Sequence, residues 1–271
     1  MEIGKALTIA GSDCGGGAGI QADLKTFQER DVFGMSVITV LTAQNTLGVH
    51  GVFPQSVEAI EAQLDAIYDD MGTDAVKTGM LFSEEIINLV AKKLVQYNVK
   101  NIVVDPVMIA KGGAPLLQKQ AMNALKTELM PLATVITPNI PEACEILSLS
   151  SIKTVPEMEE AARAIQKLGP KFVVLKGGHL DGTDYAVDVL FDGEEFYHFE
   201  SERINTIHTH GTGCTFAAVI TAELAKGKQI KEAVSVAKEF IQAAIKYSLP
   251  IGKGIGPTRH SAYRNNMQKL V

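Results

Sequence analysis

The sequence lacks the cysteine patterns and long apolar runs that mark disulfide-bonded, zinc-binding and membrane-spanning proteins. Its 271 residues contain three cysteines, Cys14, Cys144 and Cys214, which lie far apart and never form a C-x-x-C pair. A disulfide framework and a structural zinc site are therefore not expected. No apolar run reaches the length of about 18 residues that would cross a membrane, and the N-terminal run is too short for a signal peptide. We therefore expect a cytoplasmic protein with no membrane partner.

The chain also lacks an excess of positive charge. Its 25 Lys and Arg residues against 31 Asp and Glu residues give a formal net charge of −6. Because nucleic-acid binding requires a basic face, no nucleic-acid partner is expected. Local clusters of lysine and glycine can still bind a small anion inside an acidic protein. An anionic substrate therefore stays possible despite the negative net charge.

Six short runs rich in β-branched residues alternate with longer amphipathic segments. The runs are continuous rather than alternating in polarity, which is typical of strands buried on both faces of a parallel sheet. The predicted strands are residues 6–10, 36–42, 75–78, 101–105, 134–137 and 172–176.

The segments between these runs predict helices. Ser83, followed by two glutamates, and Thr154-x-x-Glu157 are start signals for two of them. Further helices fit residues 56–70, 217–225 and 231–246, and residues 186–199 read as a β-hairpin turning at Asp192-Gly193. The alternation predicts an α/β fold of the doubly wound type, formed by one domain over residues 1–271.

The first glycine cluster, residues 11–19, follows a predicted strand. Four of the five residues from Gly15 to Gly19 are glycine, which favours close approach of the backbone to a ligand over a merely flexible turn. The spacing does not match G-x-G-x-x-G, and no Walker A motif occurs in the chain. Ligands of open α/β sheets bind at the carboxyl ends of the strands, so this loop is a candidate binding site.

The second cluster, residues 208–214, leads into a predicted helix. Small residues at a helix start expose free amides and the positive end of the helix dipole, which suits an oxyanion or a migrating phosphoryl group. An ordinary capped helix start is the simpler alternative. A zinc site formed by His208, His210 and Cys214 fits no common ligand spacing. A Cys–His hydrolase would leave the lysine and acidic clusters without a role.

Two further clusters follow predicted strands. Lys176 precedes two glycines, which suits a phosphate tail, although a solvated turn is the alternative. Asp105, Asn139 and Glu142 carry oxygens that can hold Mg²⁺ directly or through water. As the alternative, Asn139 caps a helix with Pro141 in its first turn.

Taken together, these blocks resemble the ribokinase-like superfamily and, within it, the hydroxymethylpyrimidine/phosphomethylpyrimidine kinase family of thiamin biosynthesis. The resemblance implies a three-layer α/β/α fold with a mostly parallel sheet, ATP and Mg²⁺ as co-substrate and cofactor, and a homodimer. It also implies phosphorylation of 4-amino-5-hydroxymethyl-2-methylpyrimidine and then of its monophosphate. The matching blocks are LTIAGSDCGGGAGIQADLKTF (7–27), TAQNTLGVHGV (42–52), VKTGML (76–81), VVDPVMIAKGG (103–113), ITPNIPEA (136–143), VVLKGGH (173–179), NTIHTHGTGCTFAA (205–218) and GKGIGP (252–257).

The resemblance also implies the catalytic residues. Gly211, Thr212, Gly213 and Cys214 match the anion hole. Cysteine stands where many members of the superfamily have an aspartate base, and a thiol at a helix N-terminus can have a lowered pKa. Lys111 lies in a loop that covers the site in relatives and excludes water.

The remaining roles divide between the nucleotide and the substrate. By resemblance, Lys176 and Thr212 would contact the ATP phosphates, Asn139 the adjoining phosphate–water network, and Asp105 and Glu142 the Mg²⁺ region. The implied substrate pocket consists of Gly11, Asp23, Gln44, Met80 and Val107.

Two rival functions remain open. A pyridoxal kinase, with or without dual activity, would act on a similar ring. Gln44 favours the pyrimidine, because an amide can pair with a ring nitrogen and its neighbouring amine. Related pyridoxal kinases tend to have Met at that position, and Cys where this chain has Ala110. A non-catalytic ATP-binding protein is the second rival, which the intact set of Asp, Glu, Lys and Cys residues disfavours.

Overall fold

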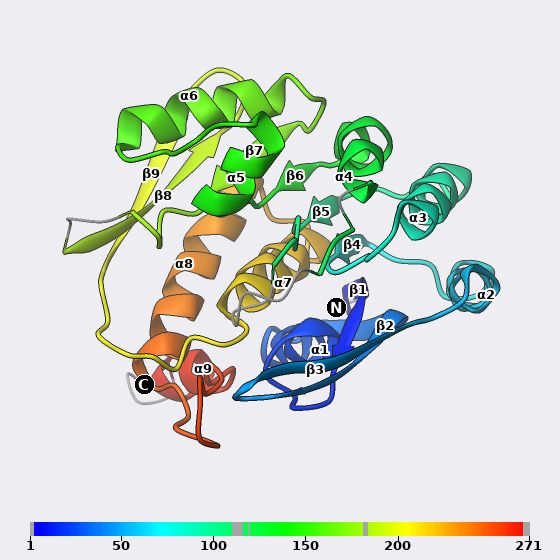
Figure 1. The fold of residues 1–271 in the computed structure, drawn as a ribbon, viewed down its shortest axis with the longest axis horizontal. Coiled ribbons are helices and arrows are strands. Elements are labelled where there is room, and N and C mark those ends of the chain that lie inside the picture. The colour runs from blue at the N-terminus through cyan, green and yellow to red at the C-terminus, as the bar shows by residue number, and fades with distance from the viewer. Residues whose placement is uncertain (1–2, 110–115, 119, 181–183, 268–271) are drawn as a thin grey trace.

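The computed structural model describes residues 3–109, 116–118, 120–180 and 184–267. The strands of these residues form one continuous sheet with helices packed on both faces (Figure 1). The strands are β1 (Lys5–Asp13), β2 (Phe33–Asn45), β3 (Gly48–Pro54), β4 (Ala75–Thr78), β5 (Ile102–Val104), β6 (Val135–Ile136), β7 (Phe172–Leu175), β8 (Tyr185–Phe191) and β9 (Phe196–Glu202).

The strand order is β3-β2-β1-β4-β5-β6-β7-β8-β9. The six strands from β2 to β7 run parallel, whereas β3 at one edge and β8 and β9 at the other are antiparallel to their neighbours. All six predicted strands and the predicted edge hairpin are confirmed. Strand β3 was not predicted, because Gly48–Pro54 contains two glycines and a histidine and is largely accessible at the edge.

The helices are α1 (Gly19–Glu29), α2 (Val57–Tyr68), α3 (Glu84–Gln96), α4 (Ala121–Ala124), α5 (Ile140–Leu147), α6 (Val155–Gln166), α7 (Thr212–Ala225), α8 (Ile230–Lys246) and α9 (Ala262–Met267). A π-turn (Leu125–Leu129) and a 3-10 turn (Met130–Leu132) continue α4. Ser83 caps α3 as predicted, since its side chain accepts from the backbone of Ile86. The predicted capping box of α6 is only half formed. Thr154 accepts from the amide of Glu157, but the Glu157 carboxylate accepts from Lys153 instead.

Two hydrophobic layers flank the sheet. One lies between the sheet and α2, α3, α5 and α6, and the other between the sheet and α7 and α8. The segment of α7 from Thr215 to Leu224 is buried on all sides, because α1 and α8 cover the face that the sheet leaves free. Among the helices of the described residues, none is long and apolar enough to cross a membrane. One continuous sheet supports the expectation of one domain, which stays a prediction.

Candidate active site

A cleft of about 990 Å³ opens at the carboxyl ends of the parallel strands. Its walls come from the ends of β1, β2, β4, β5 and β7 and from the start of α7, so the topology brings together the loops that carry the unusual residues. The predicted site residues that line it are Gly11, Gln44, Met80, Asp105, Val107, Asn139, Glu142, Lys176, Gly211, Thr212, Gly213 and Cys214.

Two predicted residues are not found on the cleft wall. Lys111 lies outside the described residues. Asp23 is fully buried within α1, and its Oδ2 accepts from the Thr8 hydroxyl at 2.6 Å and from the Lys77 ammonium at 3.0 Å. Asp23 therefore supports the cleft from behind, through Lys77, which does line it.

Buried charges of alternating sign run beneath the cleft. Lys77 lies between Asp23 and Asp105, with its Nζ 4.0 Å from Asp105 Oδ2. Asp105 in turn holds Lys176 at 3.2 Å. Burial alone would lower the pKa of Lys77, but the two carboxylates outweigh it and raise that pKa above its usual value. We call Asp23, Lys77, Asp105 and Lys176 the charge chain.

Lys77 was missed from the sequence as a site residue. The signal was present, because a lysine inside a short, continuous apolar strand must be buried and so must find a carboxylate partner. The sequence alone does not say which carboxylate that is. Asp23 lies 54 positions away along the chain.

Lys176 and Glu142 face the cleft at the far end of the charge chain. Burial alone would lower the pKa of Lys176, but Asp105 and Glu142 hold it above its usual value. Burial raises the pKa of Glu142 to about 7, and Asp105 adds to that effect. Glu142 also accepts from the Asn139 backbone while Asn139 accepts from the Glu142 amide, at 2.8 and 2.9 Å. The capping alternative for Asn139 is thus confirmed, and the same two residues line the cleft.

The start of α7 presents backbone amides to the cleft. Gly211 adopts φ of +82°, and a side chain there would collide with the carbonyl of Gly17, so only glycine fits this close approach of two loops. No side chain caps the helix, and the Thr212 hydroxyl donates to the Thr209 carbonyl at 2.7 Å. The Thr212 amide donates to the Thr209 carbonyl at 3.3 Å, so the Gly213 and Cys214 amides are the ones that face an anion.

Cys214 lies in that first turn and is partly accessible from the cleft. Burial raises the pKa of its thiol to about 12, and Asp23 and Asp105 add to the rise while Lys77 opposes it. The lowered pKa that the helix N-terminus suggested is wrong for this structure. The reason is that desolvation and two buried carboxylates outweigh the helix dipole and the lysine.

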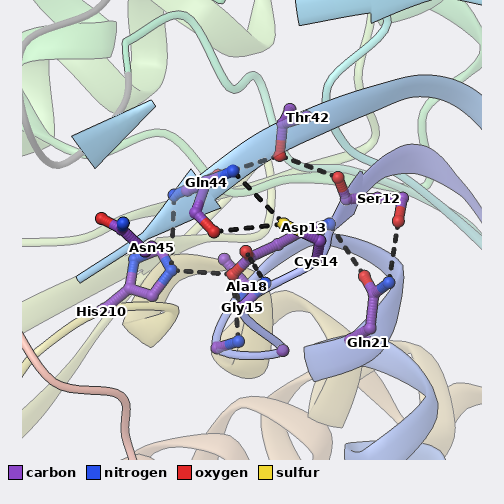
Figure 2. Close-up of polar contacts among 12 residues, drawn as sticks. Ser12, Asp13, Cys14, Gly15, Ala18, Gln21, Thr42, Gln44, Asn45 and His210 are labelled. Carbon is purple, nitrogen blue, oxygen red and sulfur yellow. Dashed lines mark hydrogen bonds and ion pairs between the residues drawn. The ribbon is translucent and has the colours of Figure 1, made fainter. Parts of the chain in front are cut away.

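Asp13 organises the glycine loop beside the start of α7 (Figure 2). Its carboxylate accepts from the amides of Gly15, Gly17 and Ala18 at 2.8–3.0 Å and lies 2.9 Å from His210 Nε2. The sequence analysis did not single out Asp13. An aspartate directly before a glycine-rich turn is a recognisable signal, since its side chain can bond to the turn amides.

An apolar part of the cleft wall was also missed. Side chains from α7 and α8 form it together with the residues that follow β9. Lys238 lines this part of the cleft and donates to Asp188 at 2.8 Å, and Asp188 accepts from the Gly177 amide at 2.9 Å. An apolar wall with a fixed backbone loop suits a flat aromatic ring.

The histidines do not form a metal site. His210 pairs with Asp13, and His208 Nδ1 accepts from the Gly256 amide at 3.0 Å. In the part of the chain that the structure describes, no three His, Cys, Asp or Glu side chains are arranged to hold a metal ion.

The fold and this cleft define a small-molecule kinase with a ribokinase-like architecture. A helix start with free backbone amides, a buried lysine and carboxylates meet at the carboxyl edge of one parallel sheet. The chain belongs to the phosphomethylpyrimidine kinase family, whose model matches residues 13–259.

Similar proteins carry two kinds of name. A hydroxymethylpyrimidine/phosphomethylpyrimidine kinase of Bacillus subtilis is 53% identical over 266 residues, which are 98% of each chain. A pyridoxine kinase of the same organism is 53% identical over 270 residues, 99% of this chain and 100% of that one. The solved structure of a pyridoxal kinase from Staphylococcus aureus, in complex with AMP-PCP and pyridoxal, is 41% identical with a TM-score of 0.90. The match covers 97% of this chain and 95% of that one.

Proposed function

We propose that the protein transfers the γ-phosphoryl group of ATP to 4-amino-5-hydroxymethyl-2-methylpyrimidine and then to the resulting monophosphate. The observation that carries this proposal is the composition of one cleft. The amide of Gln44 lies 3.4 Å from His210, just before the start of α7, and the amides of that helix start and Lys176 line the same cleft. An amide can pair with an aminopyrimidine, while the helix start and the lysine suit the phosphates.

The phosphate end would work by positioning and charge. The Lys176 Nζ lies 3.2 Å from Asp105 Oδ1, and this ion pair fixes the side chain at the end of β7. From there the ammonium would contact phosphate oxygens. The amides of Gly213 and Cys214 would stabilise the charge that develops on the migrating group. Because phosphoryl transfer depends mainly on these effects, a thiol that is neutral before substrates bind is compatible with turnover.

Mg²⁺ would bind where Asp105 and Glu142 face the cleft. The buried Asp105 Oδ2 has no hydrogen-bond partner, so this carboxylate can accept a water bound to a cation. When bound, the ion neutralises phosphate oxygens. We expect Glu142→Gln to raise the Mg²⁺ concentration for half-maximal activity several-fold, because it removes a carboxylate whose charged form a bound cation would favour. An unchanged Mg²⁺ titration would mean that Glu142 acts only as a helix cap.

Pyridoxal or pyridoxine is the second candidate substrate. Activity on both the pyrimidine and the pyridine ring is the third possibility. The observation that favours it is the equal identity, 53%, to relatives named for either ring. Initial rates with ATP and Mg²⁺ should be measured for the pyrimidine alcohol, its monophosphate, pyridoxal and pyridoxine. Phosphorylated pyrimidine as the main product supports the proposal. ATP binding without any phosphorylated product would identify a non-catalytic nucleotide-binding protein instead.

Three further expectations belong to this proposal. Lys111 would close over the bound substrates and exclude water. The protein would act as a homodimer, which sedimentation measures directly. Its place of action would be the cytoplasm, where ATP is supplied. None of these changes the assignment of the cleft.

A further inference from the structure

The carboxylate of Asp13 fixes the tautomer of His210 (Figure 2). Asp13 accepts from three loop amides, and its Oδ2 lies 2.9 Å from His210 Nε2. Burial alone would raise the pKa of Asp13, but the bonds from His210 and from the loop amides hold it below its usual value. A deprotonated carboxylate can only accept hydrogen bonds, so Nε2 of His210 must carry a hydrogen.

Gln44 meets this pair at the end of β2. Its Nε2 lies 3.4 Å from His210 Nε2, and its Oε1 lies 3.2 Å from Thr42 Oγ1. A ring nitrogen that carries a hydrogen has no lone pair with which to accept. The single hydroxyl hydrogen of Thr42 goes to the Ser12 carbonyl at 2.9 Å, so its oxygen faces Gln44 with a lone pair. The one hydrogen on His210 Nε2 goes mainly to Asp13 at 2.9 Å, so Gln44 at 3.4 Å can take only a weaker share of it, whereas Thr42 offers Gln44 an acceptor.

The two ends of an amide exchange places by a half-turn about the last side-chain bond. Only one of the two arrangements gives the amide nitrogen an acceptor and keeps it away from the His210 N–H: Nε2 donates to Thr42 Oγ1, and Oε1 lies on the His210 side, where it shares the Nε2 hydrogen with Asp13. We propose that Asp13 and His210 are positioning residues, which hold the Gln44 amide with its oxygen on the His210 side and its nitrogen on the Thr42 side. This inference rests on the proposed function, because it concerns the choice among substrates of that reaction.

The held amide selects a class of ring. Gln44 lines the cleft and keeps one N–H and one oxygen lone pair for a ligand. An edge of this kind pairs with an amine beside a ring nitrogen, as amide side chains do with adenine. The amine would lie on the His210 side and the ring nitrogen on the Thr42 side. A pyridine alcohol without that amine would leave the amide oxygen unpaired on its cleft side.

The His210 ring is held by packing as well as by hydrogen bonds. A side chain at Gly17 would collide with this ring, so the glycine leaves room for it. The His210 backbone donates to the Gly256 carbonyl and accepts from the Thr258 amide, both at 3.1 Å. Because these backbone contacts do not involve the imidazole, substitutions of the side chain should leave the loop in place.

The test compares two substrates across matched variants. His210→Phe keeps a flat ring but removes the donor, and Thr42→Val keeps the shape but removes the acceptor. Each should lower the ratio of kcat/KM for the pyrimidine alcohol to that for pyridoxal by about tenfold, through KM more than kcat. His210→Gln restores an N–H and should recover part of the ratio. His50→Phe is the matched control, since His50 lies 3.0 Å from the Asn45 side chain and should leave the ratio unchanged.

A double variant separates positioning from general support of the fold. In a Gln44→Met background there is no amide to position, so adding His210→Phe should leave the ratio unchanged. A further tenfold drop in that background would overturn the inference, as would wild-type ratios in both single variants. Calorimetric Kd values for the pyrimidine alcohol should rise about tenfold in the same single variants. A wild-type protein that binds the pyrimidine alcohol but never phosphorylates it would contradict the proposed function alone.

Discussion

The substrate end of the cleft is built from hydrogen bonds between loops, whereas the phosphate end is built from charges buried on strands. The Gln44 amide meets the hydroxyl of Thr42 and the imidazole of His210. Asp13, the one carboxylate of this group, bonds to that imidazole and to three backbone amides. Beneath Cys214, the charge chain places full charges at 3.0–4.0 Å from one another. The first arrangement depends on the direction of its hydrogen bonds, and the second depends on the charges of its buried side chains.

From this difference we infer that ring selection and phosphoryl transfer depend on different groups of residues in the cleft. A hydrogen-bond network distinguishes rings by where their donors and acceptors lie. Buried charges act on phosphate groups whatever ring carries them. A family built in this way can change its substrate at one end and keep its chemistry at the other. The predictions below disturb one end at a time.

Lys77→Met should give the largest effect on stability. It leaves Asp23 and Asp105 buried without their shared cation, so we expect the free energy of unfolding to fall by about 3–5 kcal/mol. Urea unfolding followed by circular dichroism measures this loss. Arg264→Met is the control, because the Arg264–Glu29 pair is half-exposed and should contribute less than about 1 kcal/mol. Equal, small losses in both variants would show that Lys77 is not a buried structural charge.

Cys214→Ala should lower kcat by roughly 100-fold if the thiol is the general base, with ATP binding retained. Because burial raises the pKa of this thiol to about 12, the thiolate fraction is small at pH 7 and grows about tenfold per pH unit. The kcat of the wild type should therefore rise between pH 7 and 9, and that rise should vanish in the variant.

Cys144→Ala is the control for the cysteine substitution, since Cys144 lies in α5 and does not line the cleft. Near-normal turnover in Cys214→Ala would remove the base role and leave the first-turn amides of α7 as the main contribution. That outcome would sharpen the contrast between the two ends, because the phosphate end would then act by fixed charges and dipoles alone.

The sheet was predictable because its strands are continuous apolar runs, and β4 matches its predicted bounds, Ala75–Thr78. The start of α7 was not, because Thr212, Gly213 and Cys214 have low helix propensity and form helix only in this packing. The hydrogen-bond end was harder still. Asp13 and His210 are 197 positions apart, and no local pattern predicts that they meet.

The cleft itself was predictable in outline. Parallel strands place their carboxyl ends on one edge, so residues after successive strands were expected to lie together, and twelve of the predicted residues do line one cleft. The direction of the Cys214 pKa shift was not predictable, since it depends on Asp23 and Asp105, which approach from other elements.

Gln44→Met tests most directly the claim that one end selects and the other transfers. The measurement is kcat/KM for the pyrimidine alcohol and for pyridoxal, in the wild type and in the variant. The account predicts a loss of about 1–3 kcal/mol in transition-state binding for the pyrimidine, the cost of an unmet buried hydrogen bond, with a much smaller loss or a gain for pyridoxal. Equal losses for the two substrates would contradict it, because Gln44 would then support the fold and select nothing.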